Sequence, residues 1–140
     1  MSDLTADRLA LRDLVEAYAR AADTRDADLV RACFVAGGTL TVHWLGRDPS
    51  TMVMPDDAER IPQGLARYDR TLHFVGNHHA VVDGDTATGE ACCFAHHVTG
   101  TDDHVMAIRY EDTYQRDAGT WRFATRHLRL EWTQDTTVSR

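Results

Sequence analysis

Lysine is absent from this sequence, and long apolar runs are missing as well. All 15 basic residues are arginine, against 22 Asp and Glu, which gives a formal net charge of −7. A net acidic surface repels phosphate backbones, and no basic patch with interleaved aromatic residues is present, so we expect no nucleic-acid partner. No run approaches the ~18 consecutive apolar residues of a spanning helix, so we expect no membrane partner either.

Cysteine is scarce, and its placement excludes a disulfide framework. The three cysteines, Cys33, Cys92 and Cys93, are odd in number, two of them are adjacent, and none forms a CxxC pair. We interpret them as buried free thiols rather than zinc ligands. Residues 1–14 are charged and amphipathic and lack the apolar stretch of a secretory signal peptide, which favours a cytoplasmic location.

The length and composition favour one globular domain. A chain of 140 residues suits a single domain, and 43% hydrophobic with 26% charged residues is an ordinary globular balance. We expect this domain to span 1–140, with its core at about 6–132. The polar residues 133–140 are predicted to form a frayed tail.

Three helices are predicted in the first half of the chain. Apolar residues at three- and four-residue spacing predict a first helix that continues to about Asp23. Asp26 can cap a second, shorter helix, which is expected to include Phe34 and to end at Gly37-Gly38. Asp56-Asp57 can cap a third, short helix that passes through Tyr68.

The hydrophobic period changes to two at Thr39, which predicts a strand there, and residues 46–58 are rich in turn formers and are expected to be a loop. Four longer strands are predicted at 73–82, 86–98, 105–115 and 121–132. Helices followed by long antiparallel strands indicate an α+β domain. We expect a cone-shaped α+β barrel in which the N-terminal helices pack on a curved, mainly antiparallel sheet that encloses a pocket.

Tyr18 and Asp23 are the first candidates for chemistry. They lie five residues apart, which places them ~140° apart around a helix rather than on one stripe. Asp23 lies where the first helix ends, so it can turn beneath the sheet while Tyr18 lies along the pocket wall. The simpler alternative makes Asp23 a turn or capping residue.

His73 opens a predicted strand, and strict alternation places Val75, Asn77 and His79 on its face. Histidine titrates near neutral pH and is therefore the commonest general acid or base. A histidine in such a strand is also often a satisfied core or surface residue, so position alone does not decide its role.

Either His96 or His97 can share the pocket with His73, depending on the hairpin register. A two-residue turn would pair His73 with Phe94 and turn His96 inward, whereas a three-residue turn would pair it with Ala95 and turn His97 inward. The second register turns small residues inward and polar residues outward on the 86–98 strand, so we prefer His97.

Asp23, His73 and His97 could in principle form a two-histidine, one-carboxylate metal site, but no spacing requires one, and we expect neither a metal nor a cofactor. Tyr110 could present its hydroxyl to a ligand or pack against the helices. Arg126 could bind a substrate anion, pair with Asp23 or be solvated, and structural pairing is favoured.

Three segments in this order resemble the SnoaL-like branch of the nuclear-transport-factor-two-like superfamily: LRDLVEAYARAADTRDADLVRACF, TLHFVGNHHAVVDGDTATGEA and RYEDTYQRDAGTWRFATRHL. The resemblance covers about residues 6–132 and is greatest to scytalone dehydratase and the bile-acid dehydratases. It implies a catalytic Tyr and Asp at the end of the first helix and a pocket His that opens the strand after the third helix, matched here by Tyr18, Asp23 and His73. It also implies a second pocket His at the position of His97.

Two departures separate this chain from those enzymes. Ala22 stands where scytalone dehydratase has a tyrosine, and Ala95 stands where the bile-acid enzymes have a second aspartate. The substrate therefore does not carry over, and the superfamily hosts many activities as well as proteins without catalysis.

The resemblance and the residues together predict a cofactor-independent lyase or isomerase that acts on a small hydrophobic, oxygenated molecule such as a polyketide-like or steroid-like compound. The catalytic candidates are Tyr18, Asp23, His73 and His97, and the substrate-binding candidates are Tyr110 and Arg126. In this scheme His73 moves the proton, Asp23 orients His73, and a tyrosine hydroxyl donates to the substrate oxygen. The alternative is a non-catalytic binding or interaction module of the same fold.

The preferred register also predicts the assembly. It turns Cys92 and Phe94 toward the open face of the sheet, where large apolar residues usually mark a contact. We therefore expect a homo-oligomer, with a two-fold dimer favoured over a trimer because two-fold closure is the commonest arrangement. The alternative is a monomer in which the tail at 133–140 covers Phe94.

Overall fold

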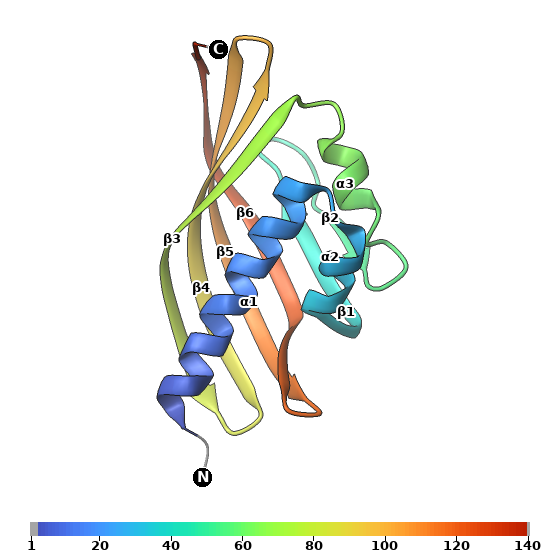
Figure 1. The fold of residues 1–140 in the computed structure, drawn as a ribbon, viewed down its shortest axis with the longest axis vertical. Helices are drawn as coiled ribbons and strands as arrows, with labels where there is room; N and C mark the ends of the chain where they lie inside the picture. The colour runs from blue at the N-terminus through green and yellow to red at the C-terminus, as the bar shows by residue number, and fades with distance from the viewer. Residues whose placement is uncertain (1–2, 140) are drawn as a thin grey trace.

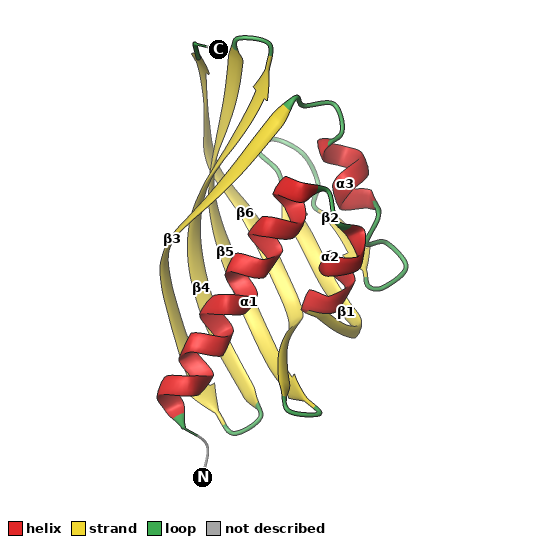
Figure 2. Ribbon diagram, viewed as in Figure 1, coloured by secondary structure: helices red, strands yellow, loops and turns green. Residues whose placement is uncertain are grey.

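The computed structural model describes residues 3–139 (Figure 1). Within this range, three helices lie against one face of a curved sheet: α1 (Leu4–Thr24), α2 (Ala27–Cys33) and α3 (Arg60–Leu65) (Figure 2). The sheet has six strands over the same residues: β1 (Phe34–His43), β2 (Ser50–Val53), β3 (Arg70–Asp83), β4 (Thr86–Thr99), β5 (Asp102–Asp117) and β6 (Thr120–Thr137). The predicted α+β class is confirmed.

The strand order is β2-β1-β6-β5-β4-β3, and every neighbouring pair is antiparallel except β1 and β6, which are parallel. The sheet stays open, with β2 and β3 as its two edges, so the helices complete the cone-shaped arrangement and the sheet itself does not close into a barrel. Instead of a further strand pairing, α1 crosses the concave face and packs against β3 (Figure 1). The helices and the curved sheet together enclose the core.

Helix α1 forms because its ends are capped and one of its faces is apolar. The Asp3 side chain accepts hydrogen bonds from the backbone N–H groups of Thr5 and Ala6, which satisfies donors left free in the first turn. Leu11, Val15 and Tyr18 are buried against the sheet. The helix ends at Thr24, and the left-handed backbone of the following Arg25 (φ 57°) turns the chain and sets Asp23 beside β3.

The second helix is shorter than predicted. Asp26 caps α2 through the N–H of Leu29, but the helix ends at Cys33, and Phe34 is the first residue of β1. Phe34 pairs with Phe123 of β6, so packing between the two strands overrides its local helical pattern. Gly37 adopts φ 79° inside β1, where the register with β6 shifts, rather than ending a helix.

The segment predicted to be a loop at 46–58 contains the short edge strand β2, which pairs with β1. Asp57 does not cap α3; its carboxylate accepts the N–H of Val53 at 2.8 Å, and α3 begins after Glu59 without a side-chain cap. Tyr68 lies beyond the end of α3. These polar residues stabilise turns of the connection instead of a helix terminus.

A bulge in β3 decides which histidines face the helices. The hairpin turn between β3 and β4 consists of Gly84 and Asp85. Farther from the turn, the pairing register shifts by one residue between Val75 and His78. His73 therefore pairs with Ala95, as the preferred register predicts, although by a bulge and not by a three-residue turn. The same shift turns His78 inward, so the expected position of His79 on the face of His73 was wrong.

The predicted frayed tail is strand over most of its length. Residues 133–137 extend β6 and pair with the start of β5, and His104 contacts Asp135 at 2.6 Å. These strand ends project beyond the helices near the C-terminus (Figure 1). The prediction of a frayed tail was wrong because it relied on polarity alone, and β-branched threonines suit a solvent-facing strand as well as a loop.

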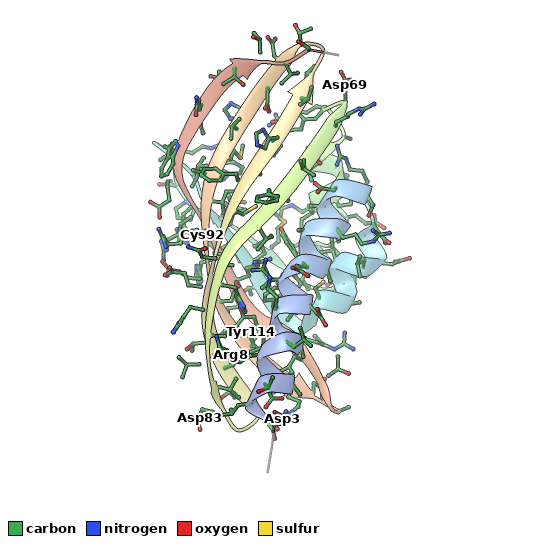
Figure 3. All side chains as sticks on the ribbon, turned by 60° about the vertical axis from the view of Figure 1, so that its left-hand side comes forward. Asp3, Arg8, Asp69, Asp83, Cys92 and Tyr114 are labelled. Atoms are coloured by element: carbon green, nitrogen blue, oxygen red, sulfur yellow. The ribbon has the colours of Figure 1, made fainter. Side chains whose placement is uncertain are left out.

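The two faces of the sheet differ in character. Tyr114 lies between the sheet and α1, whereas Cys92 lies on the face away from the helices (Figure 3). The inward set on β4 includes the small residues Ala91, Cys93 and Ala95, which leave space in front of the sheet. Across residues 3–139, none of the helices has both the length and the apolar character that a membrane crossing would need.

Candidate active site

A cavity of about 260 Å³ lies between the C-terminal half of α1, the helix α3 and the concave face of the sheet. Four of the predicted site residues, Tyr18, His73, His97 and Tyr110, line it. Most of the remaining wall is aliphatic, from strands β1, β5 and β6 and from α3. The cavity therefore suits a small, mainly apolar molecule with a few polar groups.

Asp23 and His73 form a hydrogen-bonded pair at the cavity wall. Asp23 Oδ1 lies 2.7 Å from His73 Nδ1, and Asp23 Oδ2 accepts the backbone N–H of His73 at 2.9 Å. The Thr71 hydroxyl donates to Oδ1 at 3.0 Å. Only 21% of the Asp23 side chain and 8% of the His73 side chain are exposed. The carboxylate thus holds both the ring and the backbone of the histidine.

The electrostatics of this pair favour an ionised aspartate. Burial by itself raises the pKa of Asp23, but the hydrogen bonds from His73 and Thr71 outweigh burial and hold that pKa below its ordinary value. A carboxylate only accepts, so His73 Nδ1 carries the proton. In the neutral ring the other nitrogen, Nε2, carries no proton and can act as a base.

His97 lies across the cavity from His73, with 5.8 Å between the ring centroids. It is buried, and its ring also contacts Tyr68. Its backbone N–H donates to the buried carboxylate of Asp103. Burial lowers the pKa of His97 to about 4, so the imidazole is neutral at physiological pH. His97 therefore offers a substrate a hydrogen-bond acceptor, not a positive charge.

Tyr18 and Tyr110 form the floor of the cavity, with ring centroids 6.0 Å apart. Burial raises the pKa of Tyr18 to about 12 and raises the pKa of Tyr110 well above its ordinary value. Both hydroxyls stay protonated at neutral pH, so they can donate to an oxygen or another acceptor in the cavity.

Arg126 lies beneath this floor and not on the cavity wall. Its guanidinium carbon is 3.6 Å from the ring centroid of Tyr110 and 4.5 Å from that of Tyr18, and Nε donates to Asp112 at 3.0 Å. The substrate-binding role expected for Arg126 is therefore not supported, and its carboxylate partner is Asp112 rather than Asp23. The two tyrosine rings separate the cation from the cavity.

Sequence reasoning missed Tyr68 and Thr71. Tyr68 lines the cavity, with its ring centroid 4.8 Å from that of His97, although the pattern indicated only another apolar position of a helix. Thr71 contacts Asp23 from behind the pair. Its position two residues before His73 places both on the same face of β3, which is the signal that could have identified it.

The described residues 3–139 contain no group of three His, Cys, Asp or Glu side chains that could hold a metal ion. Asp23, His73 and His97 thus do not form the facial site considered from their residue types.

The family model of the SnoaL-like domain matches residues 3–127. This chain belongs to the SnoaL-like family. An uncharacterized protein of Mycobacterium tuberculosis, Rv2910c, is 27% identical to this SnoaL-like domain over 124 residues, covering 86% of this chain and 83% of the relative.

Three solved structures share the fold of this SnoaL-like domain. Kfla4162 from Kribbella flavida has a TM-score of 0.82 at 24% identity, covering 94% of this chain and 95% of that one. The hexachlorocyclohexane dehydrochlorinase LinA-type3 from Novosphingobium barchaimii has a TM-score of 0.81 at 23% identity, covering 99% and 95%. A candidate scytalone dehydratase from Novosphingobium aromaticivorans has a TM-score of 0.79 at 21% identity, covering 96% and 91%. At these identities the likeness establishes the fold alone.

Proposed function

We propose that this SnoaL-like domain is a cofactor-independent lyase of the dehydratase type, which eliminates water from a small hydrophobic, oxygenated molecule. The observation that carries the proposal is the 2.7 Å contact between Asp23 and His73 at the wall of an apolar cavity. A general base must lie within reach of its substrate and have a stabilised conjugate acid; His73 lines the cavity, and the Asp23 carboxylate lies beside its ring. Dehydrochlorinase and candidate dehydratase neighbours of the same fold support an elimination.

In this mechanism His73 Nε2 removes a proton from the carbon next to a carbonyl. The electron pair of the broken C–H bond forms the new C=C bond, and the C–O bond to the leaving hydroxyl breaks. The imidazolium of His73 is stabilised by the Asp23 carboxylate and returns its proton to the hydroxyl, which leaves as water. The hydroxyl of Tyr18 or Tyr110 donates to the carbonyl oxygen as negative charge develops there. Return of the proton to a different carbon would give isomerase chemistry from the same site.

The test uses aromatic β-hydroxyketones as probes, because their dehydration gives a conjugated enone with a new ultraviolet absorption. We expect turnover by the parent protein and a loss of about 10²–10⁴ in rate in His73→Ala, the range for a general base. The matched control is His79→Ala on the same strand, because His79 is exposed and points away from the cavity.

Two results would overturn the proposal. A His73→Ala protein that dehydrates the probes at the parent rate would remove His73 as the base. Saturable probe binding by the parent protein, without turnover and without exchange of the probe α-proton in deuterated water, would favour the non-catalytic binding module instead.

A further inference from the structure

Behind the Asp23–His73 pair, a chain of hydrogen bonds leads away from the cavity. Arg25 Nη1 donates to the Thr71 hydroxyl at 2.7 Å, and that hydroxyl donates to Asp23 Oδ1 at 3.0 Å. Thr71 and Asp23 are 48 residues apart in sequence, so the chain connects the end of α1 to the start of β3. Neither Arg25 nor Thr71 lines the cavity.

The direction of every bond in this chain is fixed by its first member. An arginine side chain has only donors, so the Thr71 oxygen must accept from Arg25. The single hydroxyl hydrogen of Thr71 is then directed to Asp23 Oδ1. With the His73 backbone N–H on Oδ2, Asp23 receives donors on both oxygens, which favours the ionised carboxylate.

The fold holds Arg25 in the position that this chain requires. Arg25 adopts a left-handed backbone conformation at the C-terminus of α1, and its guanidinium also donates to the carbonyl oxygen of Ala22 at 2.9 Å. A cation at this end of a helix is favoured by the helix dipole and by the unpaired carbonyls of the last turn. The guanidinium is thereby held between the helix end and the Thr71 hydroxyl.

We propose that Arg25 and Thr71 are positioning residues that orient Asp23 and hold His73 in the tautomer with its proton on Nδ1 and its Nε2 free for the substrate. Thr71 supplies the donor to the carboxylate, and Arg25 prevents the hydroxyl from reversing. The role in turnover rests on the proposed function, whereas the effect on the tautomer does not.

The tautomer can be measured without any substrate. In long-range ¹H–¹⁵N spectra of the full chain, we expect His73 to have one protonated nitrogen, Nδ1, and one unprotonated nitrogen, Nε2. Thr71→Val keeps the shape of the side chain but removes the hydroxyl, and we expect it to give a mixture of tautomers and to raise the pKa of Asp23. Thr71→Ser restores the hydroxyl and should restore both. Thr88→Val, on the outer face of β4, is the matched control.

Arg25→Gly tests the other end of the chain. Glycine adopts φ 57° without strain, so this variant removes the guanidinium and leaves the turn allowed. We expect a partial shift of the His73 tautomer, smaller than in Thr71→Val, because the hydroxyl can still donate to Asp23 but is no longer held in that direction.

Turnover of the β-hydroxyketone probes supplies a second readout. Because neither residue lines the cavity, Thr71→Val should lower kcat by about ten- to a hundredfold, the range for one hydrogen bond to a charged group, and leave KM unchanged. An unchanged His73 tautomer and Asp23 titration in Thr71→Val would overturn the inference. A shifted tautomer in Thr71→Val, combined with parent activity in His73→Ala, would instead overturn the proposed function and leave the positioning intact.

Discussion

His97 Nδ1 lies 3.0 Å from the backbone carbonyl oxygen of His104. A carbonyl only accepts, so the proton of the neutral ring lies on Nδ1 and Nε2 is free. His73 has the same tautomer but a different partner, because its Nδ1 faces the Asp23 carboxylate. Of these two rings, only that of His73 is hydrogen-bonded to a carboxylate that can stabilise an imidazolium, which separates a base, His73, from a neutral acceptor, His97.

The lowered pKa of His97 predicts a pH dependence of stability. Between about pH 4 and the ordinary value of 6.5, the unfolded chain binds a proton at His97 and the folded chain does not. The free energy of unfolding therefore rises with pH across this window, by about 3 kcal/mol from this residue. Urea unfolding across the window should show a weaker pH dependence in His97→Gln than in the parent protein. Equal slopes in the two proteins would contradict the assignment, and His79→Gln is the exposed control.

Replacing Asp23 with asparagine tests whether turnover needs the negative charge of this side chain, because the two side chains have nearly the same shape. The side chain of Asp23→Asn keeps one acceptor, but its amide group can donate to Nδ1 of His73 and so favours the tautomer with the proton on Nε2. We expect probe turnover to fall by about 10²–10⁴, because the base is blocked and its conjugate acid loses its counter-charge. Asp26→Asn is the matched control, since asparagine caps a helix as well as aspartate does and Asp26 lies outside the cavity. Similar losses in both variants would point to a general effect on folding.

The fold was largely predictable because periodicity reports which face of an element is buried. The errors lie where pairing with a distant segment outweighs the local pattern. Phe34 joins β1 because it packs on Phe123, and the tail extends β6 because β5 offers it a partner. The short strand β2 is stabilised only as an edge of β1, and its own sequence has turn composition.

The sequence allowed us to predict the residue types of the site and the faces on which they lie, but not the residues with which each side chain is in contact. The tyrosine, aspartate and histidine positions follow from helix ends and strand starts. The β3 bulge does not follow from strict alternation; Gly76 inside the strand pattern is the signal that could have indicated it, and the bulge determines that His78 and not His79 faces inward. Likewise, alternation along β6 could indicate that Arg126 faces inward, whereas its cover depends on tertiary packing that brings Tyr18 of α1 and Tyr110 of β5 over it.

The buried pair of Arg126 and Asp112 should be important for stability. Both side chains are fully buried, and within the described residues Nη1 and Nη2 of Arg126 have no hydrogen-bond partner. Asp112→Asn leaves this cation without its counter-charge and should cost about 3–5 kcal/mol in the free energy of unfolding. The double variant, Asp112→Asn with Arg126→Met, should lose less free energy of unfolding than the two single variants lose together, by about 1–3 kcal/mol. Additive costs, measured by urea unfolding, would show that the pair is not coupled.

The outer face of the sheet carries the apolar residues expected at a contact between copies. Phe94 and Trp132 are 49% and 56% exposed and touch each other, with ring centroids 6.2 Å apart. Leu72 and Phe74 lie beside them in the same shallow groove, and both are more than half exposed. The tail does not cover Phe94 as a monomer would require, because residues 133–137 are paired in β6. The homo-oligomer therefore stays a prediction, and this groove is the surface through which we expect the copies to bind each other.

Light scattering of the purified protein at tens of micromolar tests this surface. We expect the mass of a dimer, because a two-fold axis through the groove would bury both copies of Phe94 and Trp132 in a single contact. Phe94→Glu should give the monomer mass, since two buried carboxylates would face each other without a cation. Leu9→Glu should leave the dimer intact, because Leu9 is 62% exposed on α1, on the opposite side of the molecule. A parent trimer that dissociates in Phe94→Glu would support this contact surface but contradict the two-fold arrangement. A monomeric parent protein would contradict the predicted homo-oligomer.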